Sequence, residues 1–231
     1  MLIGIIGKPS VGKSTFFKAM TLADVDIASY PFTTIKPNRG YGHVKIKCVE
    51  QDFDVKCKPK SGYCEKGNRF VPVELLDVAG LVPDAHKGKG RGNQFLDDLR
   101  QADAFIQVID ISGSTDAEGN PVNKGGYDPA NDIKFLEKEM DMWYYSIFQK
   151  VWKKFSYQTN QKKENIINAI IDQFSGLKVD EQSVKKALEN TGIKDKNILK
   201  WNDQDLKKFT RELRKLTKKM IEAFEYKGGW D

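Results

Sequence analysis

The sequence predicts an α/β fold with a mostly parallel β-sheet, followed by a helical region. An apolar stretch at residues 2–6 is typical of a buried parallel strand, and a glycine-rich loop and a helix follow it directly. Two further apolar stretches, at 70–76 and 104–109, each lead into a loop containing glycine and aspartate. From residue 129 onward, apolar residues recur at helical spacing instead.

The loop after the first strand carries a complete phosphate-binding motif, G-x-x-x-x-G-K-[ST], at residues 7–14. Its glycines let the backbone wrap around a phosphate, and its amide N–H groups line the cradle. We expect Lys13 to reach the β- and γ-phosphates and Ser14 to offer its hydroxyl to Mg²⁺. The motif predicts a P-loop NTPase. The predicted nucleotide-binding residues of this loop are Gly7, Pro9, Ser10, Val11, Gly12, Lys13, Ser14 and Thr15.

Two later segments are spaced as the phosphate-sensing parts of such a protein. The strand at 70–76 ends in D-V-A-G, where Asp77 is placed to hold Mg²⁺ and the Gly80 amide to sense the γ-phosphate. Residues 30–40 contain two prolines and a glycine, so we expect a loop, and its paired threonines could present a hydroxyl to Mg²⁺.

The remaining chain is assigned more coarsely. We expect a half-buried strand at 41–50, an exposed hairpin or excursion at 52–69, and a glycine-rich segment at 81–93 that stays mobile until something orders it. The expected helices are 94–101, one starting near Pro129, 162–175, 180–190 and 203–226. We predict a nucleotide-binding part at 1–128 and a helical insertion region at 129–231, with Trp143 and Trp152 in its core.

Composition and charge suit a soluble globular protein, with 39% hydrophobic and 30% charged residues. No apolar run is long enough to cross a membrane, and the apolar start is too short for a signal peptide, so we expect a cytoplasmic protein without membrane contact. Residues 150–231 hold 19 basic and 12 acidic side chains, whereas residues 1–149 are nearly neutral. This basic region is either an RNA contact or a solvated helical face.

The three cysteines, Cys48, Cys57 and Cys64, lie within seventeen positions of one another. An odd number without a secretion signal argues against a disulfide framework. Cys57 and Cys64 could be metal ligands, but their spacing is not that of a zinc knuckle and no fourth ligand stands out. We expect reduced thiols with a modest structural role.

The motifs together resemble those of the Obg-type GTPases, in particular the archaeal form of the YchF-like branch. The similarity is carried by G-K-P-S-V-G-K-S-T-F-F-K-A at 7–19, Y-P-F-T-T-I-K-P-N-R-G at 30–40 and D-V-A-G-L-V-P-D-A-H-K-G-K-G-R-G-N-Q-F-L at 77–96. The resemblance implies a G-domain with a helical insertion, hydrolysis of GTP or ATP, association with the ribosome, and a terminal TGS domain. It also implies that Ser14 and Thr34 coordinate Mg²⁺ directly, that Asp77 lies in the second coordination sphere of the ion, and that Gly80 contacts the γ-phosphate.

The sequence departs from the usual GTPase pattern in three ways. Leu81 stands where a glutamine commonly orients the attacking water, and Ser10 stands where many relatives have asparagine. No N-K-x-D motif occurs to select guanine, because Asn202 to Asp205 matches N-x-x-D only in letters and is typical of a helix N-cap. The sheet is therefore expected to be incomplete on its carboxyl-terminal side, without the strand that carries this motif and without the TGS domain.

Three functions remain open at this point. The favoured one is a slow, Mg²⁺-dependent GTPase switch in which the loops at 30–40 and 78–93 respond to the nucleotide. An ATPase of the same family is the second, since nothing in the sequence selects the base. The third is a fragment that binds RNA or the ribosome through its basic helices without hydrolysis. A P-loop kinase fits less well, because such enzymes lack the paired switch segments.

Overall fold

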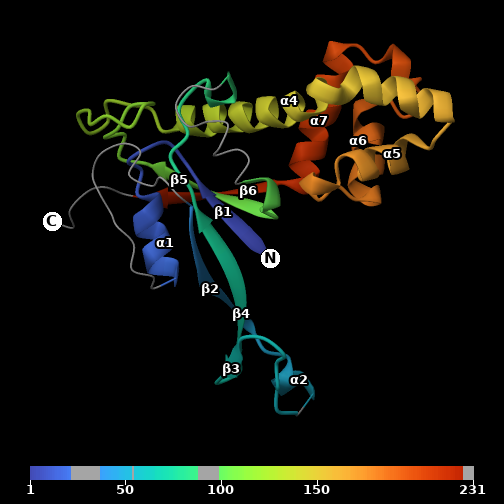
Figure 1. Ribbon diagram of the computed structural model, residues 1–231. Coiled ribbons are helices and arrows are strands. Elements are labelled where there is room, and N and C mark those ends of the chain that lie inside the picture. Colours follow the sequence, from blue (N-terminus) through green and yellow to red (C-terminus); the bar gives the residue numbers. More distant parts are fainter. Residues whose placement is uncertain (22–36, 54, 88–98, 226–231) are drawn as a thin grey trace.

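The computed structural model describes residues 1–21, 37–53, 55–87 and 99–225 (Figure 1). The expected Mg²⁺ ligand Thr34, the glycines between 88 and 92 and most of the expected helix at 94–101 lie outside these ranges. The elements are β1 (Leu2–Ile6), α1 (Lys13–Thr21), β2 (Asn38–Lys47), α2 (Glu50–Phe53), β3 (Tyr63–Glu65), β4 (Asn68–Asp77), η1 (Ala85–Lys87), η2 (Leu99–Gln101), β5 (Ala104–Asp110), α4 (Ala130–Lys162), α5 (Ile166–Gln173), η3 (Ser175–Leu177), α6 (Glu181–Thr191), η4 (Ile198–Lys200), α7 (Asp203–Thr217) and β6 (Lys219–Glu225).

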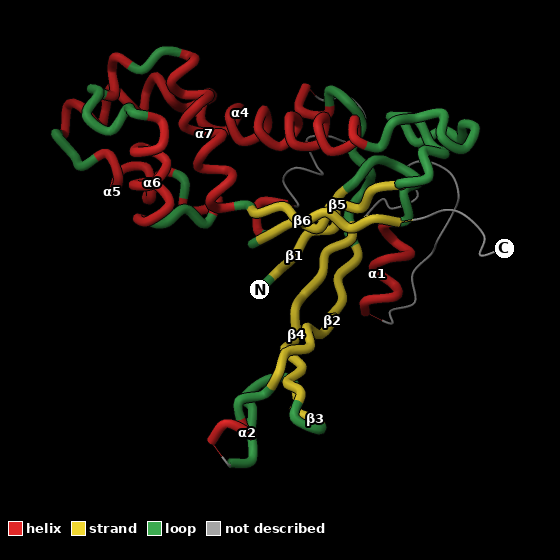
Figure 2. The backbone as a smooth tube through the Cα atoms, turned by 180° about the vertical axis from the view of Figure 1, so that it is seen from behind, coloured by secondary structure: helices red, strands yellow, loops and turns green. Residues whose placement is uncertain are grey.

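The strands form a mostly parallel sheet in the order β2-β4-β1-β5-β6, as predicted (Figure 2). Strand β1 lies between β4 and β5 and runs parallel to both, and β6 runs parallel to β5. Strand β2 and the short β3 each pair with β4 in antiparallel orientation. The parallel strands therefore end at one edge of the sheet, where ligands of open α/β folds bind.

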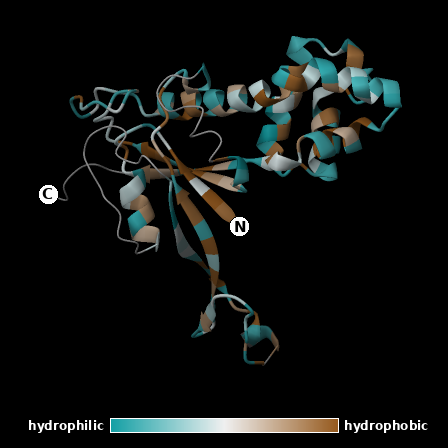
Figure 3. Ribbon diagram, viewed as in Figure 1, coloured by the Kyte–Doolittle hydropathy of each residue, from teal (hydrophilic) through white to brown (hydrophobic). Residues whose placement is uncertain are grey.

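Helices cover both faces of the sheet. On one face α1 buries Phe17 against Ile5 and Val108, within a cluster of apolar side chains under the phosphate loop. On the other face a larger cluster runs from Ile6 and Phe105 in the sheet to the aromatic side chains of α4 and α7. The apolar strands at the centre of the molecule are visible in Figure 3. The sheet and the helical region thus share one hydrophobic core.

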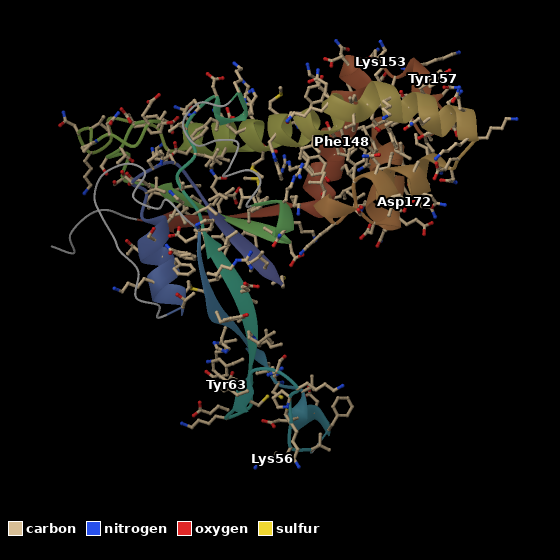
Figure 4. All side chains as sticks on the ribbon, in the orientation of Figure 1. Lys56, Tyr63, Phe148, Lys153, Tyr157 and Asp172 are labelled. Atoms are coloured by element: carbon tan, nitrogen blue, oxygen red, sulfur yellow. The ribbon has the colours of Figure 1, made fainter. Side chains whose placement is uncertain are left out.

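The helical region is built around aromatic residues of α4. Trp143 and Trp152 are buried, as predicted, and Phe148 stacks on Phe174 with ring centroids 3.7 Å apart. Phe148 points into the helical lobe, whereas Tyr157 is exposed on its outer side (Figure 4). Asn202 caps α7 by accepting the Asp205 N–H, which confirms the N-cap interpretation of this N-x-x-D sequence. None of the described helices is long and apolar enough to cross a bilayer.

The helix expected over 203–226 is wrong beyond Thr217. Residues 219–225 form β6, so the sheet contains a strand that the sequence analysis assigned to the helical region. The composition of this segment favours a helix, but pairing with β5 decides the outcome. The turn is held by Lys218, whose buried Nζ donates to the carbonyls of Arg100 and Ala102, just before β5. Strand β2 also starts earlier than expected, at Asn38, within the predicted loop.

Candidate functional site

The phosphate loop links the carboxyl end of β1 to α1, as predicted. Gly12 has a φ of 91°, a conformation that favours glycine, and α1 begins at Lys13. The Val11 side chain is fully buried under α1, so this residue can offer only its backbone to a ligand. Thr15 is exposed in the first turn of α1. The Lys13 side chain is buried and folds back over the loop, where its Nζ donates to the Lys8 carbonyl at 2.8 Å.

Ser14 and Asp77 meet at the carboxyl ends of β1 and β4. The Ser14 hydroxyl donates to Oδ2 of Asp77 at 2.7 Å, and Asp77 is fully buried. Asn38, at the start of β2, approaches the same carboxylate oxygen with its amide at 3.5 Å. A hydroxyl and a carboxylate are the oxygen donors that Mg²⁺ prefers, so this pair fits the predicted metal.

The segment after Asp77 packs directly against the phosphate loop. A Cβ on Gly80 would lie 2.5 Å from the Pro9 nitrogen, so no other residue fits there without a shift of the backbone. The Leu81 N–H donates to the Gly7 carbonyl at 3.0 Å. The Leu81 side chain is buried in the core shared with α4, which explains why an aliphatic residue stands at this position.

Ser10 has an unusual conformation for a residue with a side chain. Its φ is 62°, in the left-handed region, and its Oγ is buried without a hydrogen-bond partner among the described residues. Buried polar atoms are nearly always satisfied in proteins, so an unpaired hydroxyl in a phosphate loop fits a site that takes a polar ligand.

A buried charge pair that the sequence analysis missed connects the phosphate loop to α4. Lys8 is fully buried, and its Nζ lies 2.9 Å from Oδ2 of Asp132, near the start of α4. The same ammonium donates to the Thr115 carbonyl at 2.8 Å and lies 3.9 Å from the centre of the Tyr127 ring. Burial raises the pKa of the Asp132 carboxyl, and the Lys8 ammonium opposes this shift. Lys8 occupies a variable position of the loop motif, so the motif does not predict its contact with Asp132.

The loop that supplies the Thr115 carbonyl is organised by Asp110 at the end of β5. Its Oδ2 accepts the hydroxyls of Ser114 and Thr115, each at 2.9 Å, and its Oδ1 accepts the Ser112 N–H at 3.0 Å. An aspartate that ends a strand and precedes three hydroxyl residues is the signal that could have found this network.

A second missed contact joins α4 to the segment that follows Gly80. Glu139 is buried in α4, and its two carboxylate oxygens accept the backbone N–H groups of Asp84 at 2.8 Å and His86 at 2.9 Å. The His86 ring nitrogen Nδ1 lies 2.6 Å from the same carboxylate. Helical periodicity alone could not distinguish this glutamate from its solvated neighbours.

The structure therefore gathers the predicted loop residues with Asp77 and Gly80 at one edge of the sheet. The same residues match a known family. Residues 2–150 fit the family described as "50S ribosome-binding GTPase". The chain belongs to this family.

Individual relatives agree with this membership. An uncharacterized GTP-binding protein of Methanocaldococcus jannaschii is 51% identical over 96% of the chain and 55% of its own length. The ribosome-binding ATPase YchF of Escherichia coli O157:H7 is 36% identical over 59% of the chain and 35% of its own length. The crystal structure of a GTP-binding protein from Pyrococcus horikoshii OT3 matches with a TM-score of 0.77 and 35% identity, over 96% of the chain and 56% of that protein. The chain spans about half the length of the first relatives that it matches, and the similarity supports the YchF-like, Obg-type assignment.

Proposed function

We propose that this chain binds a Mg²⁺–nucleoside triphosphate, with GTP the favoured nucleotide, and hydrolyses it slowly as a switch. The observation that carries the proposal is the 2.7 Å contact between Ser14 and Asp77 beside the phosphate loop. It brings a hydroxyl from the first helix and a carboxylate from a second strand to one point, which is what binding of Mg²⁺ and phosphate together requires. The names of the relatives from Methanocaldococcus and Pyrococcus support GTP as the ligand.

Each predicted residue has a role in this proposal. The amides of the phosphate loop, from Gly7 to Thr15, surround the phosphates, and Lys13 neutralises their charge. Gly80 packs against Pro9 of the phosphate loop, and its amide would respond to the γ-phosphate. Ser14 and Thr34 would hold Mg²⁺, with the Asp77 carboxylate behind them, hydrogen-bonded to the Ser14 hydroxyl. The bound Mg²⁺ supplies charge neutralisation of the triphosphate.

ATP is the alternative nucleotide. The Escherichia coli relative is named an ATPase, and the 231 residues contain no N-K-x-D motif to select guanine. A phosphate loop contacts parts that GTP and ATP share, so we expect these residues to bind the two with affinities within about tenfold of each other.

The proposed partner is the ribosome, and the proposed location is the cytoplasm. The family description and the name of the Escherichia coli relative both support a ribosomal partner. The excess of basic residues after position 150 offers a surface for RNA. In this proposal residues 1–128 bind the nucleotide and the helices after 129 contact the partner, while β6 adds a strand next to β5.

Phosphate release under Mg²⁺–GTP tests the enzymatic part of the proposal. Wild-type protein is compared with Lys13→Ala and with Lys18→Ala, which removes an exposed lysine of the same helix. We expect slow turnover in wild type and in Lys18→Ala, and none above background in Lys13→Ala. Nucleotide binding without turnover in wild type would favour the alternative of a protein that binds RNA or the ribosome without hydrolysis. Equal turnover in all three proteins would contradict the assignment of Lys13 to the nucleotide site.

A further inference from the structure

The three cysteines come together at the tip of a hairpin far from the nucleotide site. Cys48 follows β2, Cys57 follows α2, and Cys64 lies in β3. Their sulfur atoms all lie within 4.8 Å of one another, and those of Cys48 and Cys64 are 3.4 Å apart. All three thiols are free of disulfides. The tip carries Lys56 and Tyr63 and projects away from both the sheet and the helical lobe (Figure 4).

This tip has no hydrophobic core of its own. Of the residues from 49 to 67 whose exposure is described, none is buried, and Cys48 is the buried residue that adjoins them. The apolar side chains of Val49, Phe53 and Val55 are exposed by 60% or more. A segment of this size without a core is normally held by a disulfide or a metal ion. The cysteine cluster is the feature at the tip that can supply such a link.

The geometry favours a metal ion over a disulfide. A disulfide would use two of the thiols and leave the third without a role, whereas a metal ion uses all three. In a tetrahedral zinc site with bonds of about 2.3 Å, sulfur atoms lie about 3.8 Å apart, close to the spacing seen here. The cluster also has a supporting contact: the Glu50 carboxylate accepts the Cys57 N–H at 3.0 Å.

We propose that Cys48, Cys57 and Cys64 bind one Zn²⁺ ion through three thiolates, with water in the fourth position. Cys57 and Cys64 are partly exposed, so water can reach the metal. The ion joins the two sides of the hairpin and replaces the missing core. The sequence analysis preferred simple reduced thiols because the linear spacing did not show that the three residues meet.

Metal content and metal spectroscopy test this site. The reduced 231-residue chain is loaded with Zn²⁺, desalted and analysed for zinc by mass spectrometry, and Co²⁺ is titrated in parallel. The variants are Cys57→Ser and Cys64→Ser. The control is His86→Ala, which disrupts the cluster of Asp84, His86 and Glu139, the other group of described residues spaced to hold an ion.

We expect one zinc per chain in wild type and in His86→Ala, and affinity at least about a hundredfold weaker in each serine variant. Wild-type protein with Co²⁺ should show the thiolate charge-transfer bands of a tetrahedral site, a result that holds even if a serine variant does not fold. Removal of zinc should also speed tryptic cleavage in the tip about tenfold or more. Failure of the reduced wild type to bind either metal would overturn the proposal, as would unchanged affinity in the serine variants or a Cys48–Cys64 disulfide that persists in the presence of zinc. None of these readouts depends on nucleotide binding.

Discussion

At the residue scale, Leu81 contributes its side chain to the core and its backbone to a contact with the phosphate loop. Its N–H is bound to the phosphate loop, while its side chain is 1% exposed and packs against the core that extends into α4. An aliphatic side chain cannot orient a water molecule, and in this structure it packs in the core instead. In the proposed hydrolysis, another group or a partner must therefore position the attacking water.

Leu81→Ala should lower the free energy of unfolding by about 2–4 kcal/mol, because it leaves a cavity in a packed core. Leu81→Met, which keeps the volume, should cost less than about 1.5 kcal/mol. Urea denaturation measures both. The rate of phosphate release per folded molecule should stay within about tenfold of wild type. A collapse of turnover in Leu81→Met with normal stability would show that the side chain does position the site.

Lys218 makes stability depend on pH. Burial lowers the pKa of its amine to about 8, from 10.5 in the unfolded chain. Between these values the unfolded state binds more protons, so the free energy of unfolding should rise as pH increases from about 8 towards 10, by up to about 3 kcal/mol. Tyr145 has the opposite effect above pH 10. Burial raises the pKa of its phenol to about 12, so the native state keeps a proton that the unfolded state loses, and the free energy of unfolding should fall as pH rises. The slope between pH 8 and 10 should be absent in Lys218→Met, and an unchanged slope would contradict this assignment.

At the scale of elements, α4 is tied to the segment after Gly80 through the Glu139 carboxylate. Glu139→Gln keeps the shape but replaces one acceptor oxygen with a donor, which leaves a backbone N–H of Asp84 or His86 unsatisfied. We expect a loss of about 1–3 kcal/mol in the free energy of unfolding. Lys138→Gln, an exposed neighbour on the same helix, is the control and should stay within about 0.5 kcal/mol. Equal effects of the two substitutions would show that the Glu139 contact does not stabilise the protein.

The elements also show what could be predicted from sequence. The phosphate loop, Asp77 and Gly80 were predictable because phosphate and Mg²⁺ binding requires particular residue types at set intervals. Strand β6 was not, because Lys219 to Glu225 has helical composition and becomes a strand only by pairing with β5. The Lys8 and Glu139 contacts and the cysteine cluster join positions far apart in sequence or at unfamiliar spacing. No local pattern reports such contacts.

At the scale of the whole molecule, the buried pair of Lys8 and Asp132 connects the nucleotide loop to the helical region. The pair lies just after β1 and near the start of α4, and both side chains are buried. The helix α4 carries both this contact and the Glu139 contact, so it touches the phosphate loop and the segment after Gly80. Under the proposed function, α4 is the element that would link the nucleotide site to a partner on the helical lobe.

Asp132→Asn should cost about 3–5 kcal/mol in the free energy of unfolding, because it leaves the Lys8 ammonium buried without its counter-charge. The double variant with Lys8→Met and Asp132→Leu should be less destabilised than the sum of the single variants Lys8→Met and Asp132→Leu. Urea unfolding of wild type, these two single variants and the double variant provides the cycle. Strict additivity would mean that the two charges do not stabilise each other.

The measurement that tests the central claim most directly is a calorimetric titration of Mg²⁺–GTP and Mg²⁺–ATP into wild-type protein, Lys13→Ala and Lys18→Ala. Charge-assisted hydrogen bonds contribute about 1.5–3 kcal/mol, and more when they are desolvated. Lys13→Ala should therefore bind both nucleotides about tenfold to a hundredfold more weakly than wild type, or without detectable heat. Wild type and Lys18→Ala should bind both nucleotides with affinities within about tenfold of each other. Unchanged affinity in a folded Lys13→Ala protein would contradict the assignment of this loop as the nucleotide site.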